Sequence, residues 1–195
     1  MTTTHLDLGV QAAEVARLVG LVHDDQLPAP TPCAGTSVAA LLDHVHGLSV
    51  GMRMAARKMP VEAAPTASAD ALPADWRSRI PQELEALVAS WRDPAAWEGT
   101  TRAGLAELPA SVMGVVALNE VLVHGWDLAV ALGAPYAVDD AAVQACLAHA
   151  VRFAAAMPEA RAQIYGPVVP VPDDAPAFDR LLGLTGRDPG WRPPG

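Results

Sequence analysis

The chain has 195 residues, 51% of them apolar, and a formal net charge of −9 at pH 7. This length suits one domain whose core is large enough to need no disulfide. The apolar fraction excludes a largely disordered chain. The negative charge argues against a nucleic-acid-binding protein and against a polybasic contact with a membrane.

The sequence also carries no pattern for export or for a membrane span. Its first residues lack the basic and apolar regions of a signal peptide. No run of 18 residues is purely apolar, so we predict no transmembrane helix. The two cysteines, Cys33 and Cys146, stand far apart in the sequence. We therefore expect a cytoplasmic protein with free thiols.

Apolar residues recur at helical spacing in five long segments. The predicted helices cover about residues 6–24, 38–59, 76–91, 112–132 and 140–157. A hydroxyl of Thr36 or Ser37 is expected to cap the second helix, and Asp139 the fifth. Gly133 is expected to end the fourth helix in a left-handed conformation, and Pro158 to stop the fifth.

The segments between these helices differ in composition. Residues 60–74 have no period and predict a mobile linker, whereas residues 93–110 predict a loop with a short hairpin. Residues 160–195 predict a proline-rich strap followed by a short helix. With almost no alternating strand pattern, the whole chain, 1–195, is expected to form one all-α bundle domain.

Three residues on two apolar helices form a candidate metal site. Glu120 and His124 are four residues apart, so they lie on one face of the predicted helix 112–132. His44, on the predicted second helix, lies beside apolar positions and can supply a second imidazole. A buried carboxylate and imidazole need a partner, and a divalent ion is one. Two histidines and one carboxylate leave coordination positions open for catalysis.

A simpler interpretation of the same residues is also open. A glutamate and a histidine four residues apart often form an ordinary surface pair, and this is not the His-Glu-x-x-His pattern of zinc peptidases. The apolar surroundings of Glu120 and His124 favour the metal hypothesis. Asp127, one turn beyond His124, could orient an imidazole N–H from outside the ligand set.

The remaining polar candidates carry weaker signals. Cys33 lies roughly 16 Å of helix rise from His44, which argues against a fourth ligand. Arg187 could bind an anion, pair with Asp188 or contact a helix end. Cys146 and Trp126 fit core packing better than chemistry. The other histidines are interpreted as surface, interface or capping residues: His5, His23, His46 and His149.

Three stretches resemble one family. They are residues 31–45 (TPCAGTSVAALLDHV), residues 119–129 (NEVLVHGWDLA) and residues 179–191 (DRLLGLTGRDPGW). They are similar to the mycothiol-dependent maleylpyruvate isomerase-like proteins of the DinB/YfiT-like superfamily, in particular to an actinobacterial subfamily. The resemblance implies a four-helix core that holds a divalent metal through His44, Glu120 and His124. Where the family usually has tryptophan this chain has Thr36, which predicts a different entry into the second helix.

The resemblance also implies a function. We expect an enzyme that activates a low-molecular-weight thiol, mycothiol, on the metal and transfers it to a small electrophile or uses it in isomerisation. Zinc is the first expectation for the metal, with nickel, iron or manganese as alternatives. We expect no counterpart of the isomerase's larger C-terminal domain in these 195 residues, so the reaction itself is left open. The alternative is a non-catalytic metal-binding bundle that acts in sensing, sequestration or interaction. A homodimer is possible for the enzyme and for the non-catalytic bundle.

Overall fold

The computed structural model describes residues 6–59, 66–104 and 106–193. Within these residues α-helix is the main secondary structure, as predicted. The α-helices are α1 (Gly9–Val19), α2 (Val38–Ala56), α3 (Trp76–Trp91), α4 (Ala110–Ala131), α5 (Asp140–Ala156), α6 (Pro158–Tyr165) and α7 (Ala177–Leu184). A small antiparallel hairpin joins α3 to α4, with strands β1 (Thr100–Ala103) and β2 (Ala106–Pro109).

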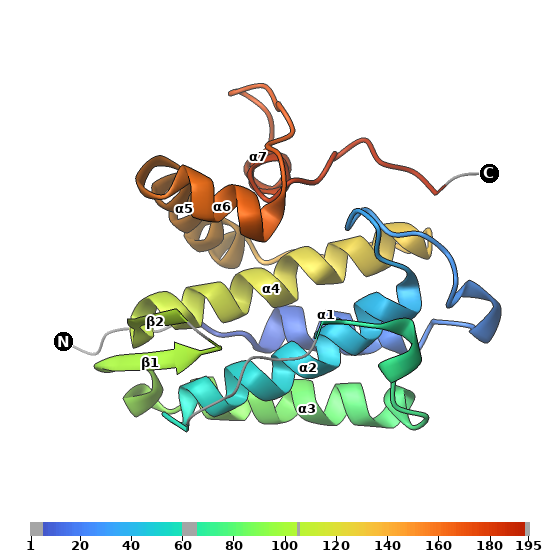
Figure 1. Ribbon diagram of the computed structural model, residues 1–195, viewed down its shortest axis with the longest axis horizontal. Helices are drawn as coiled ribbons and strands as arrows, with labels where there is room; N and C mark the ends of the chain where they lie inside the picture. The colour runs from blue at the N-terminus through green and yellow to red at the C-terminus, as the bar shows by residue number, and fades with distance from the viewer. Residues whose placement is uncertain (1–5, 60–65, 105, 194–195) are drawn as a thin grey trace.

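Helices α1 to α4 form a four-helix bundle. In this bundle α2 packs on α3 and α4, and α1 packs on the same two helices from the other side. The three C-terminal helices form a second group on the far side of α4 (Figure 1). There α5 packs on α4, and α6 and α7 both pack on α5. The helix α4 therefore lies between the bundle and the C-terminal group.

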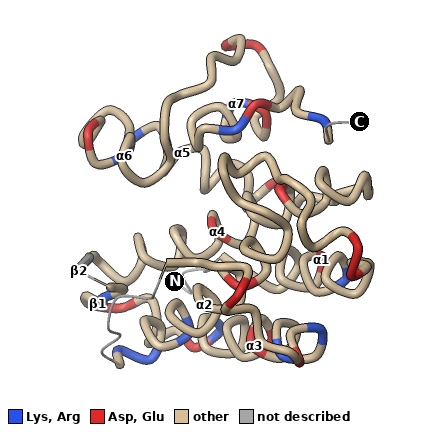
Figure 2. The backbone as a smooth tube through the Cα atoms, turned by 45° about the vertical axis from the view of Figure 1, so that its right-hand side comes forward, with Lys and Arg blue, Asp and Glu red and all other residues tan. Residues whose placement is uncertain are grey.

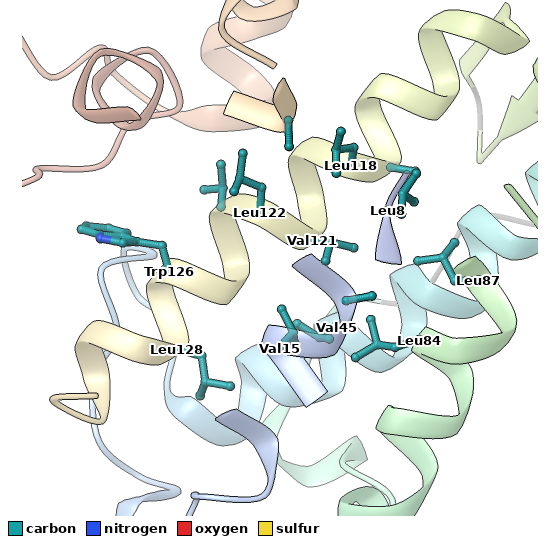
Figure 3. Close-up of a cluster of buried hydrophobic side chains, with 14 of the residues drawn as sticks. Leu8, Val15, Val45, Leu84, Leu87, Leu118, Val121, Leu122, Trp126 and Leu128 are labelled. Carbon is teal, nitrogen blue, oxygen red and sulfur yellow. The ribbon is translucent and has the colours of Figure 1, made fainter. Parts of the chain in front are cut away.

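The core explains why α4 is apolar around most of its circumference. Val15, Val45 and Val121 project into the space inside the bundle, while Leu118 and Leu122 project from α4 toward α5 (Figure 3). By length and composition α4 would also pass as a membrane span, but 78% of its most apolar window is buried within the protein. A helix that is apolar on all sides is what a position between two packed layers requires.

Several predicted helix ends are confirmed. Ser37, rather than Thr36, caps α2 by accepting a hydrogen bond from the Ala40 N–H at 3.3 Å. Asp139 caps α5 by accepting from the Ala142 N–H at 2.8 Å. Gly133 follows α4 with a φ of +64°, the left-handed conformation that was expected of it.

Other predictions about the chain were wrong. Pro158 does not end the helical region, because it occupies the first turn of α6, where its missing N–H costs nothing. The strap predicted from residue 160 accordingly begins at Gly166. The first helix is shorter than predicted, since α1 ends at Val19.

The segment 60–74 also differs from the mobile linker that was predicted. Residues 60–65 lie outside the described residues. The part that is described contains a short 3-10 helix, Ala69–Ala71, and packs against α2. The Ser68 N–H donates to Asp43 Oδ2 of α2 at 3.0 Å. This hydrogen bond holds the segment against α2. Its acceptor, Asp43, directly precedes His44 in the sequence.

Candidate metal centre

The structure brings His44, Glu120 and His124 together. His44 extends from α2 and the other two from α4, and one ligand-type atom of each lies within 4.8 Å of the others. Glu120 Oε2 is 3.2 Å from His124 Nε2 and 3.6 Å from His44 Nε2. The two imidazole rings meet edge to face, with centroids 4.7 Å apart. We call this cluster the His-Glu-His site.

Burial increases across the site from α2 to α4. The side chain of His44 is 40% exposed, that of Glu120 is 16% exposed and that of His124 is 9% exposed. The prediction that all three face inward is therefore right for the two residues of α4, whereas His44 stands at the opening. A site with one open side admits ligands from solvent.

The hydrogen bonds of Asp127 determine which nitrogen of His124 faces the site. Asp127 is fully buried, and its Oδ2 accepts a hydrogen bond from His124 Nδ1 at 2.9 Å. With Nδ1 paired with Asp127, it is Nε2 that faces Glu120 and that a metal ion would bind after Nε2 has lost its proton. A carboxylate behind an imidazole ligand orients the ring and raises its basicity in known metal sites. The expected role of Asp127 is thus supported by its geometry.

Arg187 neutralises Asp127 from the C-terminal group. Its Nη2 donates to Asp127 Oδ2 at 2.9 Å and its Nε to Oδ1 at 3.3 Å. Its Nη1 donates to the Thr185 carbonyl at the end of α7, at 2.6 Å. Of the expectations for Arg187, the helix-end contact is confirmed, and the pair with Asp188 is replaced by the pair with Asp127. The two partners are 60 positions apart in the sequence, so no local pattern indicates this pair.

Gly186 makes the position of Arg187 attainable. Its φ is +77°, and a Cβ built there would lie 2.1 Å from the Tyr165 carbonyl oxygen. A side chain at this position would therefore be strained and would also clash with the end of α6. The glycine allows the chain to turn directly after α7 and to bring the next residue, Arg187, back to α4.

Gly125 serves a similar purpose on α4. A Cβ there would lie 2.3 Å from the Tyr136 hydroxyl and 2.8 Å from Val15 Cγ2. Tyr136 is fixed because its hydroxyl donates to the Leu122 carbonyl at 2.8 Å and accepts from Gln11 Nε2 at 2.9 Å. The glycine after His124 thus lets α1 and Tyr136 pack tightly against the helix that carries two residues of the site.

The charges of the site are strongly coupled. Burial alone would raise the pKa of Glu120, but hydrogen bonds from His124 and His44 outweigh it, and the pKa lies far below its ordinary value. Burial would lower the pKa of His124, but the hydrogen bonds to Asp127 and Glu120 raise it to about 10. Without a metal, His124 is therefore protonated on both ring nitrogens at neutral pH and carries a positive charge. A divalent ion at Nε2 would replace that positive charge.

The expectation that Cys33 lies far from the site was wrong. Its Sγ lies within 4.8 Å of a ring nitrogen of His124 and a carboxylate oxygen of Asp127. The loop before α2 folds back over the site, and Thr36 Oγ1 donates to Cys33 Sγ at 3.5 Å. Because Asp127 already accepts from His124 and Arg187, this second cluster has fewer free ligand atoms than the His-Glu-His site. Cys33 is therefore a neighbour of the His-Glu-His site.

A cavity of about 660 Å³ opens beside these residues. Its wall includes the His-Glu-His site, Cys33 and Thr36 on one side, and Tyr165 and Gly166 from the end of α6 on the other. The volume falls in the ordinary range for small-molecule pockets. The sequence does not predict the contribution of α6, because its pattern indicates that the helical region ends at Pro158.

The remaining candidates lie elsewhere. Cys146 is fully buried, and burial raises the pKa of its thiol to about 12, as expected for a core residue. Trp126 belongs to the hydrophobic core. Among the described residues, His23, His46 and His149 belong to no cluster of metal-ligand type, and His149 stacks on Phe153. His5 lies outside the described residues.

The distances of the His-Glu-His site fit a metal ion. A zinc ion bound at about 2.0–2.2 Å to tetrahedrally arranged ligands holds neighbouring ligand atoms about 3.3–3.6 Å apart. The two separations from Glu120 Oε2, 3.2 and 3.6 Å, are close to this spacing, and the imidazole nitrogens of His44 and His124 lie within 4.8 Å of each other. Glu120 and Asp127 are also the only acidic residues of α4, and this helix contains no lysine or arginine (Figure 2). One small cation would hold all three side chains.

Fold and site together define a helical-bundle protein with two imidazoles and a carboxylate on the wall of an inter-helix cavity. A family model described as the mycothiol maleylpyruvate isomerase N-terminal domain matches residues 8–129. Two uncharacterized Mycobacterium tuberculosis proteins, from strains CDC 1551 and H37Rv, are each 31% identical over 179 residues, which is 88% of this chain and 91% of theirs. The chain belongs to the mycothiol maleylpyruvate isomerase N-terminal domain family.

Solved structures agree on the fold. A crystal structure of the mycothiol-dependent maleylpyruvate isomerase superposes with a TM-score of 0.59 at 17% sequence identity. The match covers 73% of this chain and 66% of that one, and a histidine-to-alanine mutant of the same enzyme matches equally well. The chain thus spans slightly less than two thirds of the isomerase. The resemblance noted from the sequence is confirmed at the level of family and all-α fold.

Proposed function

We propose that the protein is a metal-dependent enzyme that uses a low-molecular-weight thiol, mycothiol, to act on a small electrophile. The observation that carries this proposal is the spacing of Glu120 Oε2 from the two imidazole Nε2 atoms, 3.2 and 3.6 Å, on the wall of a cavity. The names of the family and of the enzyme with the similar crystal structure both contain mycothiol, which supports the choice of thiol.

His44, Glu120 and His124 would hold the ion, with zinc the first choice for this set of ligands. A bound divalent ion would lower the pKa of a thiol, so that the thiol reacts as a thiolate at neutral pH. His44 leaves the site open toward solvent, whereas Asp127 holds a proton on His124 Nδ1 and keeps Nε2 directed at the site.

The charge balance of the site suits an anionic sulfur. Two carboxylates, Glu120 and Asp127, are countered by the guanidinium of Arg187. A divalent ion added to this set, with both imidazoles neutral, leaves one net positive charge. A thiolate would neutralise that charge in a partly buried site, where the attraction is stronger than in water. A neutral electrophile could then enter the cavity at little electrostatic cost.

The rival proposal is a bundle that binds a metal without catalysis, for sensing or sequestration. The two differ in the coordination of the metal, because an enzyme needs a position that a ligand can take, whereas a closed four-ligand site serves structure. The open side at His44 favours the enzyme.

A thermal-shift experiment tests the choice. The metal-free protein is heated with zinc, nickel or manganese, each with and without mycothiol. The enzyme proposal expects the thiol to raise the melting temperature only when metal is present, because a ligand stabilises the state to which it binds. A metal-dependent shift that mycothiol leaves unchanged would favour the rival. His44→Ala should lose the shift with metal, and His46→Ala, at a histidine of α2 outside the cluster, is its matched control.

A further inference from the structure

Two polar side chains on the cavity wall have hydrogen-bonding groups that remain unpaired. Asn119, which directly precedes Glu120 in α4, is only 2% exposed. Its Nδ2 donates to the Tyr165 hydroxyl at 3.3 Å, while its Oδ1 is buried and has no hydrogen-bond partner among the described residues. The Tyr165 hydroxyl accepts this bond, and its own hydrogen has no acceptor in the described part of the chain.

Both residues also belong to the wall of the cavity that contains the His-Glu-His site. Asn119 and Glu120 are consecutive in α4, so their Cα atoms are about 3.8 Å apart. Tyr165 is the last residue of α6 and covers the cavity from the C-terminal group. Burial and the nearby carboxylate of Glu120 both raise the pKa of Tyr165, so its hydroxyl remains a hydrogen-bond donor at neutral pH.

The unpaired groups are one acceptor, Asn119 Oδ1, and one donor, the Tyr165 O–H. A ligand that satisfies both must itself donate and accept. A carboxylate cannot donate and an ammonium cannot accept, whereas a hydroxyl group and a secondary amide can do both. An unpaired acceptor in a buried wall is unfavourable, so a group that pairs with it gains affinity over an apolar group of the same size.

We propose that Asn119 and Tyr165 form a subsite for a hydroxyl or amide group of the thiol cosubstrate. This inference rests on the proposed function, because it places the sulfur at the His-Glu-His site. Because Asn119 and Tyr165 line the same cavity as the His-Glu-His site, a thiol whose sulfur is held at that site could place a polar group a few bonds away against the pair. The subsite would select thiols with such a group over plain alkanethiols.

The test measures thiol binding without catalysis. The metal-free protein is loaded with Co²⁺, and each thiol is titrated while the absorption band of thiolate bound to cobalt is recorded. The two thiols are N-acetylcysteamine, which carries a secondary amide, and 1-pentanethiol, which has a chain of equal length without one. Wild type, Asn119→Leu and Tyr165→Phe are compared, with Thr66→Val as a control at another polar residue of the cavity wall.

The proposal expects each subsite variant to weaken binding of N-acetylcysteamine by roughly three- to tenfold, since one hydrogen bond is lost. Binding of 1-pentanethiol should change little, and Thr66→Val should match wild type. Circular dichroism shows whether each variant folds. If one of the two subsite variants does not fold, the other still tests the subsite.

Two other outcomes would contradict the subsite alone, or the subsite together with the proposed function. If both thiols give the band but the ratio of their affinities is the same in wild type and in the variants, the subsite is refuted and the proposed function stands. If neither thiol gives a band with the cobalt-loaded wild type, the proposed function fails, and the subsite fails with it.

Discussion

The chain of contacts from Arg187 through Asp127 to His124 makes a prediction that separates folding from metal binding. Asp127→Asn removes the charge that opposes a buried guanidinium and weakens the acceptor for His124 Nδ1. Breaking a buried ion pair by removing one partner costs about 3–5 kcal/mol of stability. Loss of a carboxylate behind a metal-binding histidine costs about 10–100-fold in metal affinity. The single variant should show both losses.

A double variant, Asp127→Asn with Arg187→Met, distinguishes the two effects. It removes the unpaired guanidinium, so most of the lost stability should return. The metal affinity should stay reduced, because His124 still lacks its carboxylate. Stability is measured by urea unfolding of the metal-free protein and affinity by competition with a chelator. Full recovery of metal affinity in the double variant would refute the role that the geometry gives to Asp127.

Three further predictions concern packing, pH and the neighbouring thiol. Gly125→Ala should destabilise the protein by about 1–3 kcal/mol in urea unfolding, because its Cβ would lie 2.3 Å from the Tyr136 hydroxyl; an unchanged midpoint would contradict the packing described. Because the pKa of His124 is about 10 without metal, metal binding must displace its proton, and affinity should rise about tenfold per pH unit from pH 6 to 8 in chelator competition; a flat profile would contradict this. Bound metal and thiol should slow alkylation of Cys33, measured by mass spectrometry, whereas buried Cys146 should be unreactive throughout. If Cys33 is alkylated at the same rate with and without metal and thiol, the thiol binds elsewhere.

The sequence predicted the parts of the molecule that depend on local pattern. The helix Trp76–Trp91 has the predicted bounds, because buried apolar side chains recur at helical spacing from its first residue to its last. His44, Glu120 and His124 meet as predicted, because helical spacing places Glu120 and His124 on one face of α4 and α2 packs against this helix.

The parts that failed depend on how distant segments meet. The separation of Cys33 from His44 along the chain predicts a distant thiol, whereas the loop before α2 folds back and places Cys33 beside His124. The partner of Arg187 lies 60 residues away, and no local pattern could identify it. The role of Tyr165 was missed because a proline can start a helix as well as stop one, and Pro158 starts α6.

The central claim is that one divalent ion is held between α2 and α4. The most direct measurement is elemental analysis of protein purified without an affinity metal, for wild type, His124→Ala and the control His46→Ala. We predict one metal ion per chain in wild type and in the control, and none in His124→Ala, with unchanged helical circular dichroism. Metal retained at full stoichiometry in His124→Ala, or no metal in wild type even after zinc is supplied, would contradict it.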